Sequence, residues 1–249
     1  MQEHSRSPAL DLIDNFPAFE KAAAYLEATI LARNCKVIAD VGGGAHPLLD
    51  DEFILRHGID YSVLDKSMAE LMKADSCGEK VEVDAIGSGD AFLAGIGDRR
   101  FDLIFSHMFL EHIDNPIQAH VNFYAALKPG GICVHIYPSP NNLPLALNRF
   151  LPESVSSVLI KVAQPGRDFA SSQKKFKAYY RLCGAPGPKI SAVFEKIGYK
   201  IARHTGYIGH NYYARFEPAA MLETRLRKLI HRLQLPLTSG CLLVLEKGR

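Results

Sequence analysis

The sequence predicts an α/β fold built around a doubly wound, mostly parallel sheet, and three observations lead to this class. Short apolar runs alternate with helix-like segments five times in the first 140 residues, no repeat of fixed period accompanies them, and the first run ends in a glycine turn. Such alternation is typical of βαβ units, in which each helix crosses back over the sheet. The chain then closes with helix, strand, helix and strand, which indicates that the last strand inserts antiparallel.

Strands are expected at apolar and β-branched runs that lie between turn residues. The first run, "KVIADV", is continuously apolar, as is typical of strands that a parallel sheet buries on both faces. The seven expected strands cover residues 36–41, 60–65, 80–86, 101–107, 132–137, 199–207 and 239–248.

Helices are expected where apolar residues recur every three or four positions. In "PKISAVFEKIG", Ile190, Val193, Phe194 and Ile197 form such a face, and Gly198 ends the helix. The main expected helices cover residues 15–34, 47–58, 67–74, 114–129, 188–198 and 217–234.

Residues 138–185 interrupt this alternation. They open with "PSPNNLP" and carry irregular helical signals but no strand pattern. We therefore expect a helical insertion, or cap, after the fifth strand, within a single domain that spans residues 1–249. A chain of 249 residues with 47% hydrophobic content is long and apolar enough for one such domain.

The composition excludes several other classes of protein. Pro, Asn or Gly interrupts every apolar stretch before it reaches the ~18 residues of a membrane span. The N-terminal segment carries acids where a secretory signal has its apolar region, so a cytoplasmic protein is expected. The five cysteines are widely spaced and form no C-x-x-C pair, which argues against a zinc site or a disulfide framework, and no metal is expected.

Charge is distributed unevenly along the chain, although the net charge is only +2. Residues 141–249 hold 18 Lys and Arg against 6 Asp and Glu, whereas residues 1–140 hold 11 against 21. A basic C-terminal part indicates an anionic acceptor, a membrane surface or nucleic acid as its partner. A solvated face that compensates the acidic half is the alternative.

The stretch "VIADVGGGAHPLLD" places Asp40 at the end of the first strand and Gly42 and Gly44 in the turn after it. A dinucleotide fingerprint has a third glycine, but Pro47 occupies that position, which disfavours a nicotinamide or flavin site. Glycines allow a backbone to approach a ligand closely, and Pro47 suits the first turn of a helix. Taken alone, this stretch is consistent with a ligand-holding loop or with a plain tight turn.

Acids end three successive strands, at Asp40, Asp65 and Asp84. Ligands of open α/β sheets bind at the carboxyl ends of the strands. Asp65 ends the second strand, where a carboxylate can accept hydrogen bonds from both hydroxyls of a ribose. Asp84 ends the third strand, from which a side chain or the next amide can reach an adenine edge.

These elements together resemble the class I S-adenosylmethionine-dependent methyltransferases of the small-molecule type. "DVGGGAH" is similar to the family's first motif, acid-x-G-x-G-x-G, except that His46 replaces the last glycine. "YSVLD" ends in the second-motif acid, and Asp84 with Ala85 matches the third motif, for which Asp90 and Ala91 are a competing alignment. "FDLIFSHMFLEHIDN" and "LKPGG" match the fourth motif and the turn into the fifth strand.

The resemblance implies S-adenosyl-L-methionine as the cofactor and a Rossmann-like, seven-stranded mixed sheet with strand order 3-2-1-4-5-7-6. It covers residues 37–136 and leaves the insertion and most of the C-terminal half unmatched. Methyl transfer from a sulfonium is an in-line displacement, so positioning and desolvation can supply most of the catalysis. The residues expected to bind the cofactor are Asp40, Gly42, Gly44, His46, Asp65, Asp84, Ala85 and Ser106.

Two residues are candidates for catalysis. His107 follows the fourth strand at the ligand edge and is the first choice for contact with the cofactor or the acceptor, because histidine is the usual base at neutral pH. Tyr137 lies at the end of the fifth strand and is expected to line the acceptor cleft. His112 is expected to anchor its loop, and His46 either closes over the methionine part of the cofactor or caps a helix.

Acceptor contacts are expected from the stretch "GYIGHNYYARF", at His210, Tyr212 and Arg215, because aromatic rings beside an arginine suit a sugar, a base or a phosphorylated acceptor. Loop aromatics folded over the insertion are the alternative. Helix 217–234 has leucines on one side and basic residues among the rest. Such a helix can lie on an anionic bilayer, or it packs on the sheet or on another subunit.

The sequence therefore predicts a methyltransferase that acts on a small or medium, anionic acceptor: a sugar, a lipid-linked compound or a phosphorylated metabolite. Two alternatives remain, a nicotinamide-dependent oxidoreductase and a non-catalytic module that binds membranes or nucleic acid on a degenerate core. Methylation of a nucleic-acid base is disfavoured, because "SHMFLEH" follows the fourth strand where that branch has an acidic or Asn-Pro-Pro-aromatic motif. The sequence leaves the oligomeric state open.

Overall fold

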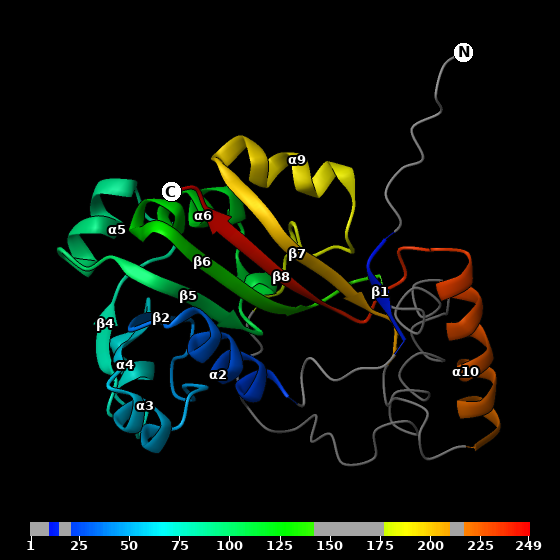
Figure 1. Cartoon of the computed structure of the whole chain (residues 1–249), viewed down its shortest axis with the longest axis horizontal. Helices are drawn as coiled ribbons and strands as arrows, with labels where there is room; N and C mark the ends of the chain where they lie inside the picture. Colours follow the sequence, from blue (N-terminus) through cyan, green and yellow to red (C-terminus); the bar gives the residue numbers. More distant parts are fainter. Residues whose placement is uncertain (1–9, 15–20, 142–176, 210–216) are drawn as a thin grey trace.

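The computed structural model describes residues 10–14, 21–141, 177–209 and 217–249, and within these an eight-stranded sheet forms the centre of the molecule (Figure 1). The strands are β1 (Leu12–Ile13), β2 (Val37–Val41), β3 (Asp60–Asp65), β4 (Glu79–Glu82), β5 (Phe101–His107), β6 (Leu127–Pro138), β7 (Tyr199–Tyr207) and β8 (Gly240–Lys247). Their order across the sheet is β1-β7-β8-β6-β5-β2-β3-β4. Neighbouring strands are parallel except where β8 pairs with β6 and β7.

The expected mixed sheet is confirmed, with one difference in strand number. All seven expected strands are present, in the expected order, and the last one is antiparallel. The count of seven was wrong because β1 adds an edge strand, pairing Leu12 with Gly206 and Ile13 with Tyr207. Two paired residues are too few to give a strand a readable alternation.

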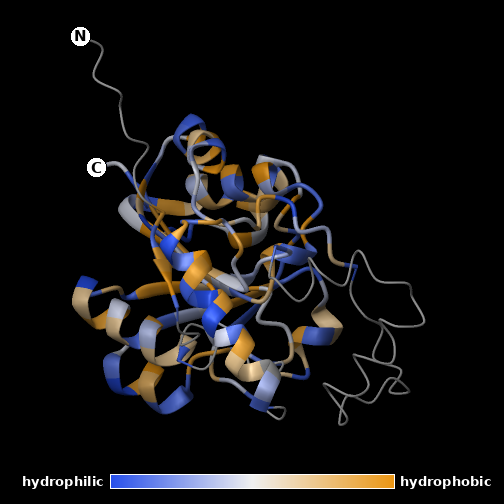
Figure 2. Ribbon diagram, turned by 90° about the vertical axis from the view of Figure 1, so that its right-hand side faces the viewer, coloured by the Kyte–Doolittle hydropathy of each residue, from blue (hydrophilic) through white to orange (hydrophobic). Residues whose placement is uncertain are grey.

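Helices cover both faces of the sheet. One face carries α2 (Ala22–Arg33), α3 (Asp51–His57) and α4 (Met68–Leu71), and the other carries α5 (Gly89–Ile96), α6 (Pro116–Ala126) and α9 (Pro188–Ile197) (Figure 1). Colouring by hydropathy shows hydrophobic residues along the central strands and a mixture of hydrophilic and hydrophobic residues on the surrounding helices (Figure 2).

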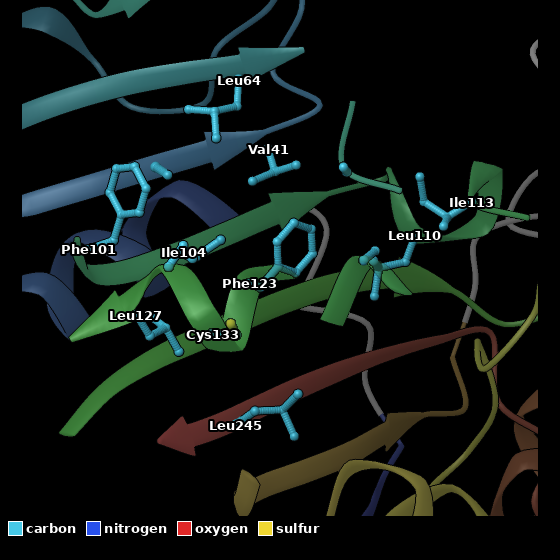
Figure 3. Packing of buried hydrophobic residues seen from close by; sticks show 14 of the residues in the cluster. Val41, Leu64, Phe101, Ile104, Leu110, Ile113, Phe123, Leu127, Cys133 and Leu245 are labelled. Carbon is cyan, nitrogen blue, oxygen red and sulfur yellow. The ribbon is translucent and has the colours of Figure 1, made fainter. Parts of the chain in front are cut away.

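Two apolar clusters, one on each face, hold these three layers together. Figure 3 shows part of the first, in which Val41, Leu64 and Ile104 from three neighbouring strands pack near Phe123 of α6. Leu26 of α2 belongs to the cluster on the opposite face. Burial on both faces explains why the strands read as continuous apolar runs.

Several boundaries differ from the expectation, and the strand expected over residues 80–86 ends at Glu82, two residues before Asp84. The helix expected to begin at Pro47 begins at Asp51, because the carboxylate of Asp50 accepts a hydrogen bond from the Glu52 amide at 2.7 Å and caps the helix there. Strand β6 begins at Leu127, earlier than expected, and its pairing with β5 shifts register after that residue. The shift accommodates the glycines of "LKPGG" within the strand.

The expected cap stays a prediction, since most of it, residues 142–176, lies outside the described residues. Of its described part, residues 177–185 form a loop without a helix, and the Glu111 carbonyl oxygen accepts hydrogen bonds from the Tyr179 and Tyr180 amides at 2.7 and 3.1 Å. The helix expected at 217–234 is confirmed as α10 (Glu217–Arg232). No helix in the described ranges is long and apolar enough to cross a membrane.

Candidate functional site

The sheet reverses its winding between β2 and β5. From β2 the chain moves outward through β3 to β4, and it then returns to place β5 on the opposite side of β2. The helices that follow β2 and β5 cover opposite faces. Open α/β sheets bind their ligands in the crevice at such a point, outside the carboxyl ends of the two strands. The glycine turn follows one of these strands and the "SHMFLEH" segment follows the other.

The glycine turn contacts the segment after β5 through Gly42 and Phe109. Gly42 has a φ of +79°, and a Cβ atom there would lie 2.1 Å from Cδ2 of the Phe109 ring. Its amide donates to the Leu64 carbonyl at 2.8 Å. Only glycine satisfies both the positive φ and this close approach, so Gly42 allows the two sides of the crevice to pack against each other.

Asp40 supports the turn from below. Its side chain is buried, and Oδ2 accepts hydrogen bonds from the Tyr61 hydroxyl at 2.8 Å and from the Leu48 amide at 3.1 Å. Burial raises the pKa of this carboxyl to about 6. The bond to Leu48 links the strand end to the far side of the turn, so Asp40 fixes the shape of the loop, on which His46 is exposed.

Asp65 meets the turn from the neighbouring strand. Its Oδ1 accepts a hydrogen bond from the Ser67 amide at 3.0 Å, and its Oδ2 lies 3.3 Å from the position that a Cβ atom on Gly44 would take. The residue is half-buried, and this burial raises the pKa of its carboxyl. The carboxylate therefore lies directly beside the glycine turn, as parallel pairing of β2 with β3 requires.

Asp84 and Ala85 follow at the next strand. β4 ends at Glu82, and the Val83 amide donates to the Asp65 carbonyl at 2.8 Å, which keeps the two strand ends together. Asp84 is exposed and accepts a hydrogen bond from the Ile86 amide through Oδ1.

Asn122 of α6 fixes the backbone of this loop from the other side. Its side-chain amide donates to the carbonyls of Ala85 and Gly87, each at 2.9 Å. The competing pair, Asp90 and Ala91, lies instead in the first turn of α5.

His107 ends β5 on the other side of the crevice. It is half-buried, and burial lowers the pKa of its imidazole, which keeps the ring neutral at pH 7. Ser106 is buried and its Oγ lies 2.8 Å from Nδ1 of His135. The structure thus places His107 at the carboxyl end of β5 with its side chain half-buried, and it places the Ser106 side chain in the core.

The model of the methyltransferase domain family matches residues 1–180. The chain belongs to this family. Its expected resemblance to the class I methyltransferases is confirmed. No curated protein matches the sequence at a significant level.

Solved structures show the same fold at low identity. A SAM-dependent methyltransferase from Archaeoglobus fulgidus matches with a TM-score of 0.51 at 15% identity, covering 94% of this chain and all of that one. Magnesium protoporphyrin IX methyltransferase from Synechocystis PCC 6803, solved with bound SAH, gives 0.53 at 11% identity and covers 92% and 83%. The [4+2]-cyclase SpnF gives 0.50 at 14% identity, covering 97% and 88%. The last match shows that the fold by itself does not decide the reaction.

Tyr137 of this methyltransferase domain is not where the sequence predicted. Its side chain is 0% exposed, and its hydroxyl lies 3.1 Å from Nε2 of His204 and 3.4 Å from the Gly184 carbonyl. The face of β6 that carries it is covered, so Tyr137 packs in the core rather than lining a cleft. His210, Tyr212 and Arg215 lie outside the described residues, and their expected role stays a prediction.

The sequence did not single out Phe109, Tyr61 or Asn122, although all three position the site. Their contacts join residues that are far apart in the chain, and no spacing rule reports such contacts. Glu111 was read only as part of a motif, but it is 3% exposed, and burial raises the pKa of its carboxyl to about 7. Its Oε2 has no hydrogen-bond partner within the described part of the chain.

Proposed function

We propose that this chain binds S-adenosyl-L-methionine at the β2–β5 crevice and transfers its methyl group to a small or medium, anionic acceptor. The observation that carries the proposal is the meeting of the glycine turn with the Asp65 carboxylate, whose Oδ2 lies 3.3 Å from the Cβ position of Gly44. A glycine turn beside a strand-end acid is the arrangement that holds a nucleoside with its ribose on the acid.

Each part of the cofactor has residues suited to it. The Asp65 carboxylate accepts hydrogen bonds from the ribose hydroxyls. Asp84 and the amide of Ala85 lie at the neighbouring strand end and recognise the adenine edge. The turn at Gly42 and Gly44 admits the amino-acid end of the cofactor. The exposed His46 stands at the same end, where the family has a glycine.

The reaction needs little chemistry from the protein. Bound S-adenosylmethionine supplies a methyl group on a sulfonium, so the side chains have to orient the acceptor and exclude water. His107 is the candidate base, because its lowered pKa leaves the imidazole neutral and able to accept a proton from an acceptor hydroxyl. Tyr137 has no part in this proposal, because its hydroxyl lies within the core.

The charge of the C-terminal half supports an anionic acceptor. Residues 141–249 carry 18 Lys and Arg against 6 Asp and Glu. A field of this sign attracts and orients phosphorylated or otherwise anionic compounds. Within this part, His210, Tyr212 and Arg215 are the residues proposed to contact the acceptor. Sugars, lipid-linked compounds and phosphorylated metabolites are the acceptor classes to screen.

Calorimetry with S-adenosylhomocysteine tests the cofactor site. We expect wild-type protein to bind it and Asp65→Ala to bind at least about tenfold more weakly, because hydrogen bonds to a charged group contribute roughly 1.5–3 kcal/mol. Asp60→Ala is the matched control, since Asp60 is an exposed acid at the opposite end of the same strand. NAD and NADP, titrated in parallel, should show no binding.

Two results would contradict the proposal: no binding of S-adenosylhomocysteine to the wild type, or equal affinity for the Asp65 and Asp60 variants. Because the same fold occurs in a cyclase, binding alone is insufficient. Transfer of labelled methyl from S-adenosylmethionine to an acceptor pool must also be measured at limiting cofactor, and it should fall at least about tenfold in Asp65→Ala but not in Asp60→Ala.

A further inference from the structure

Helix α10 is attached to the sheet by one narrow face. Its Ile230 packs with Leu12 of β1 and with Ile208, which follows β7. Arg227 lies 3.5 Å from the carboxylate of Asp14. These contacts use the inward side of the helix, and α10 stands at the β1 end of the molecule (Figure 1).

The outward side of α10 carries a stripe of exposed leucines. Leu222 and Leu229 of the helix and Leu233, in the turn directly after it, are 58%, 48% and 56% exposed. They are spaced seven and four positions apart, so they lie along one side of the helix. Single exposed leucines are ordinary on a protein surface, but several in line on one helix mark an interaction site.

A stripe of cations runs beside the leucines. Arg225, Lys228 and Arg232 are all exposed and are spaced three and four positions apart. Within the described residues, no ion pair involves any of the three. Arg227, in contrast, faces inward and is 3.6 Å from Glu223. Figure 2 is drawn with the α10 end of the molecule towards the viewer.

We propose that the outward face of α10 docks the protein on the surface of an anionic phospholipid bilayer. Two adjacent stripes, one apolar and one cationic, match the bilayer boundary. The leucines enter the zone between headgroups and acyl chains, while the long stems of arginine and lysine keep their charges among the phosphates. Each cation near such a surface contributes to the attraction.

Other partners fit the two stripes less well. A second copy in a two-fold dimer would bring the same patch against itself, and the row formed by Arg225, Lys228 and Arg232 would face an identical row of like charge. The buried centre of a protein interface is depleted of charges. Nucleic acid would accept the cations but leave Leu222, Leu229 and Leu233 in water.

Vesicle co-sedimentation with the full chain tests the proposal. One set of vesicles contains phosphatidylcholine with about a third of phosphatidylglycerol, and the other contains phosphatidylcholine alone. We expect binding to the anionic vesicles, weaker binding at high salt, and little binding to the neutral ones. These measurements need no cofactor, so their outcome is independent of the proposed methyl transfer.

Two double variants separate the contributions of the stripes. Leu229→Ser with Leu233→Ser should lower partitioning at least roughly tenfold, because apolar burial is lost. Leu55→Ser is the control, an exposed leucine of α3 on another part of the surface (71% exposed). Arg225→Gln with Arg232→Gln should lower partitioning about 30-fold at low salt, at about fivefold for each cation.

The charge variant needs a control that removes two positive charges elsewhere. Lys189→Gln with Lys196→Gln does so on the exposed side of α9, and it should bind nearly as well as the wild type. Thermal unfolding of each variant, with and without S-adenosylhomocysteine, verifies folding and shows whether the cofactor site is intact.

Any of four outcomes overturns the proposal: no binding to anionic vesicles, equal binding to neutral vesicles, equal loss in the α9 and α10 charge variants, or unchanged binding after Leu229→Ser with Leu233→Ser. Light scattering measures the oligomeric state and so tests whether α10 instead binds a second copy of the chain. If the wild type is a dimer that the leucine variants dissociate, and vesicles do not bind, α10 is a subunit interface instead.

Discussion

Replacing Gly42 by alanine tests the contact on which the candidate site depends. Gly42 has a φ of +79°, and an added Cβ would lie 2.1 Å from Cδ2 of Phe109, well inside van der Waals distance. The Phe109 ring must therefore move, and it belongs to the segment that forms one side of the crevice. Gly58 supplies a matched control, because its φ is +57° and a Cβ there meets nothing within 4 Å.

Both substitutions place an alanine at a positive φ, and only Gly42→Ala also introduces a clash with Phe109. An alanine in the left-handed region costs about 1 kcal/mol, which is the whole effect expected for Gly58→Ala. Gly42→Ala adds an overpacking cost of about 1–3 kcal/mol, so its total is about 2–4 kcal/mol. Urea unfolding with a common m-value measures both. Because Phe109 borders the crevice, Gly42→Ala should also weaken S-adenosylhomocysteine binding, whereas Gly58→Ala should not.

A double variant shows whether Phe109 is the cause. In Gly42→Ala with Phe109→Ala the clash is absent, so the destabilisation should fall short of the sum of the single effects by about 1–3 kcal/mol. Equal destabilisation by Gly42→Ala and Gly58→Ala would refute the reasoning, and so would additivity in the double variant.

Buried titratable groups give two further predictions, both read from urea unfolding at several pH values. Burial lowers the pKa of His120 to about 3 from 6.5, so its contribution to stability is complete above pH 6.5 and is lost as the pH falls below that value. The free energy of unfolding of His120→Phe, relative to that of the wild type, should therefore rise by about 2 kcal/mol as the pH falls from 6.5 to 5. A difference that does not change with pH would contradict the assignment. Burial raises the pKa of Glu111 to about 7 from 4.5, so its contribution is complete below pH 4.5 and is lost as the pH rises to 7. The free energy of unfolding of Glu111→Gln, relative to that of the wild type, should rise by about 3 kcal/mol as the pH rises over that interval. A relative rise towards acid pH would refute the assignment.

The sequence predicted the buried strands, because each of them leaves a recognisable apolar run in the chain. A parallel sheet covered on both faces needs continuous apolar runs, and these locate every strand except β1. It could not locate β1, because two residues form that strand and its partner in β7 lies almost 200 positions away. The predicted start of α3 at Pro47 was wrong, because the side chain of Asp50 caps the helix and sets its start at Asp51.

The same distinction holds for the candidate site. Residues at the ends of adjacent parallel strands must lie together, so Asp65 beside the glycine turn was predictable. The sequence did not predict which face of a strand is covered. Tyr137 and Ser106 stand at the ligand end of their strands, yet neighbours that come from distant parts of the chain enclose both side chains. The contact between Phe109 and Gly42 likewise required the structure.

The two proposals together bear on the choice of acceptor. β7 is parallel to β6, since both are antiparallel to β8, so its carboxyl end lies at the same edge of the sheet as the glycine turn. Ile208 follows that end directly and packs against Ile230 of α10. A bilayer bound by α10 would therefore lie at the edge of the sheet where the cofactor is expected. Of the three acceptor classes, this arrangement favours the lipid-linked one. Transfer to such an acceptor in anionic vesicles should fall in the leucine variant of α10, whereas transfer to a water-soluble acceptor should not change.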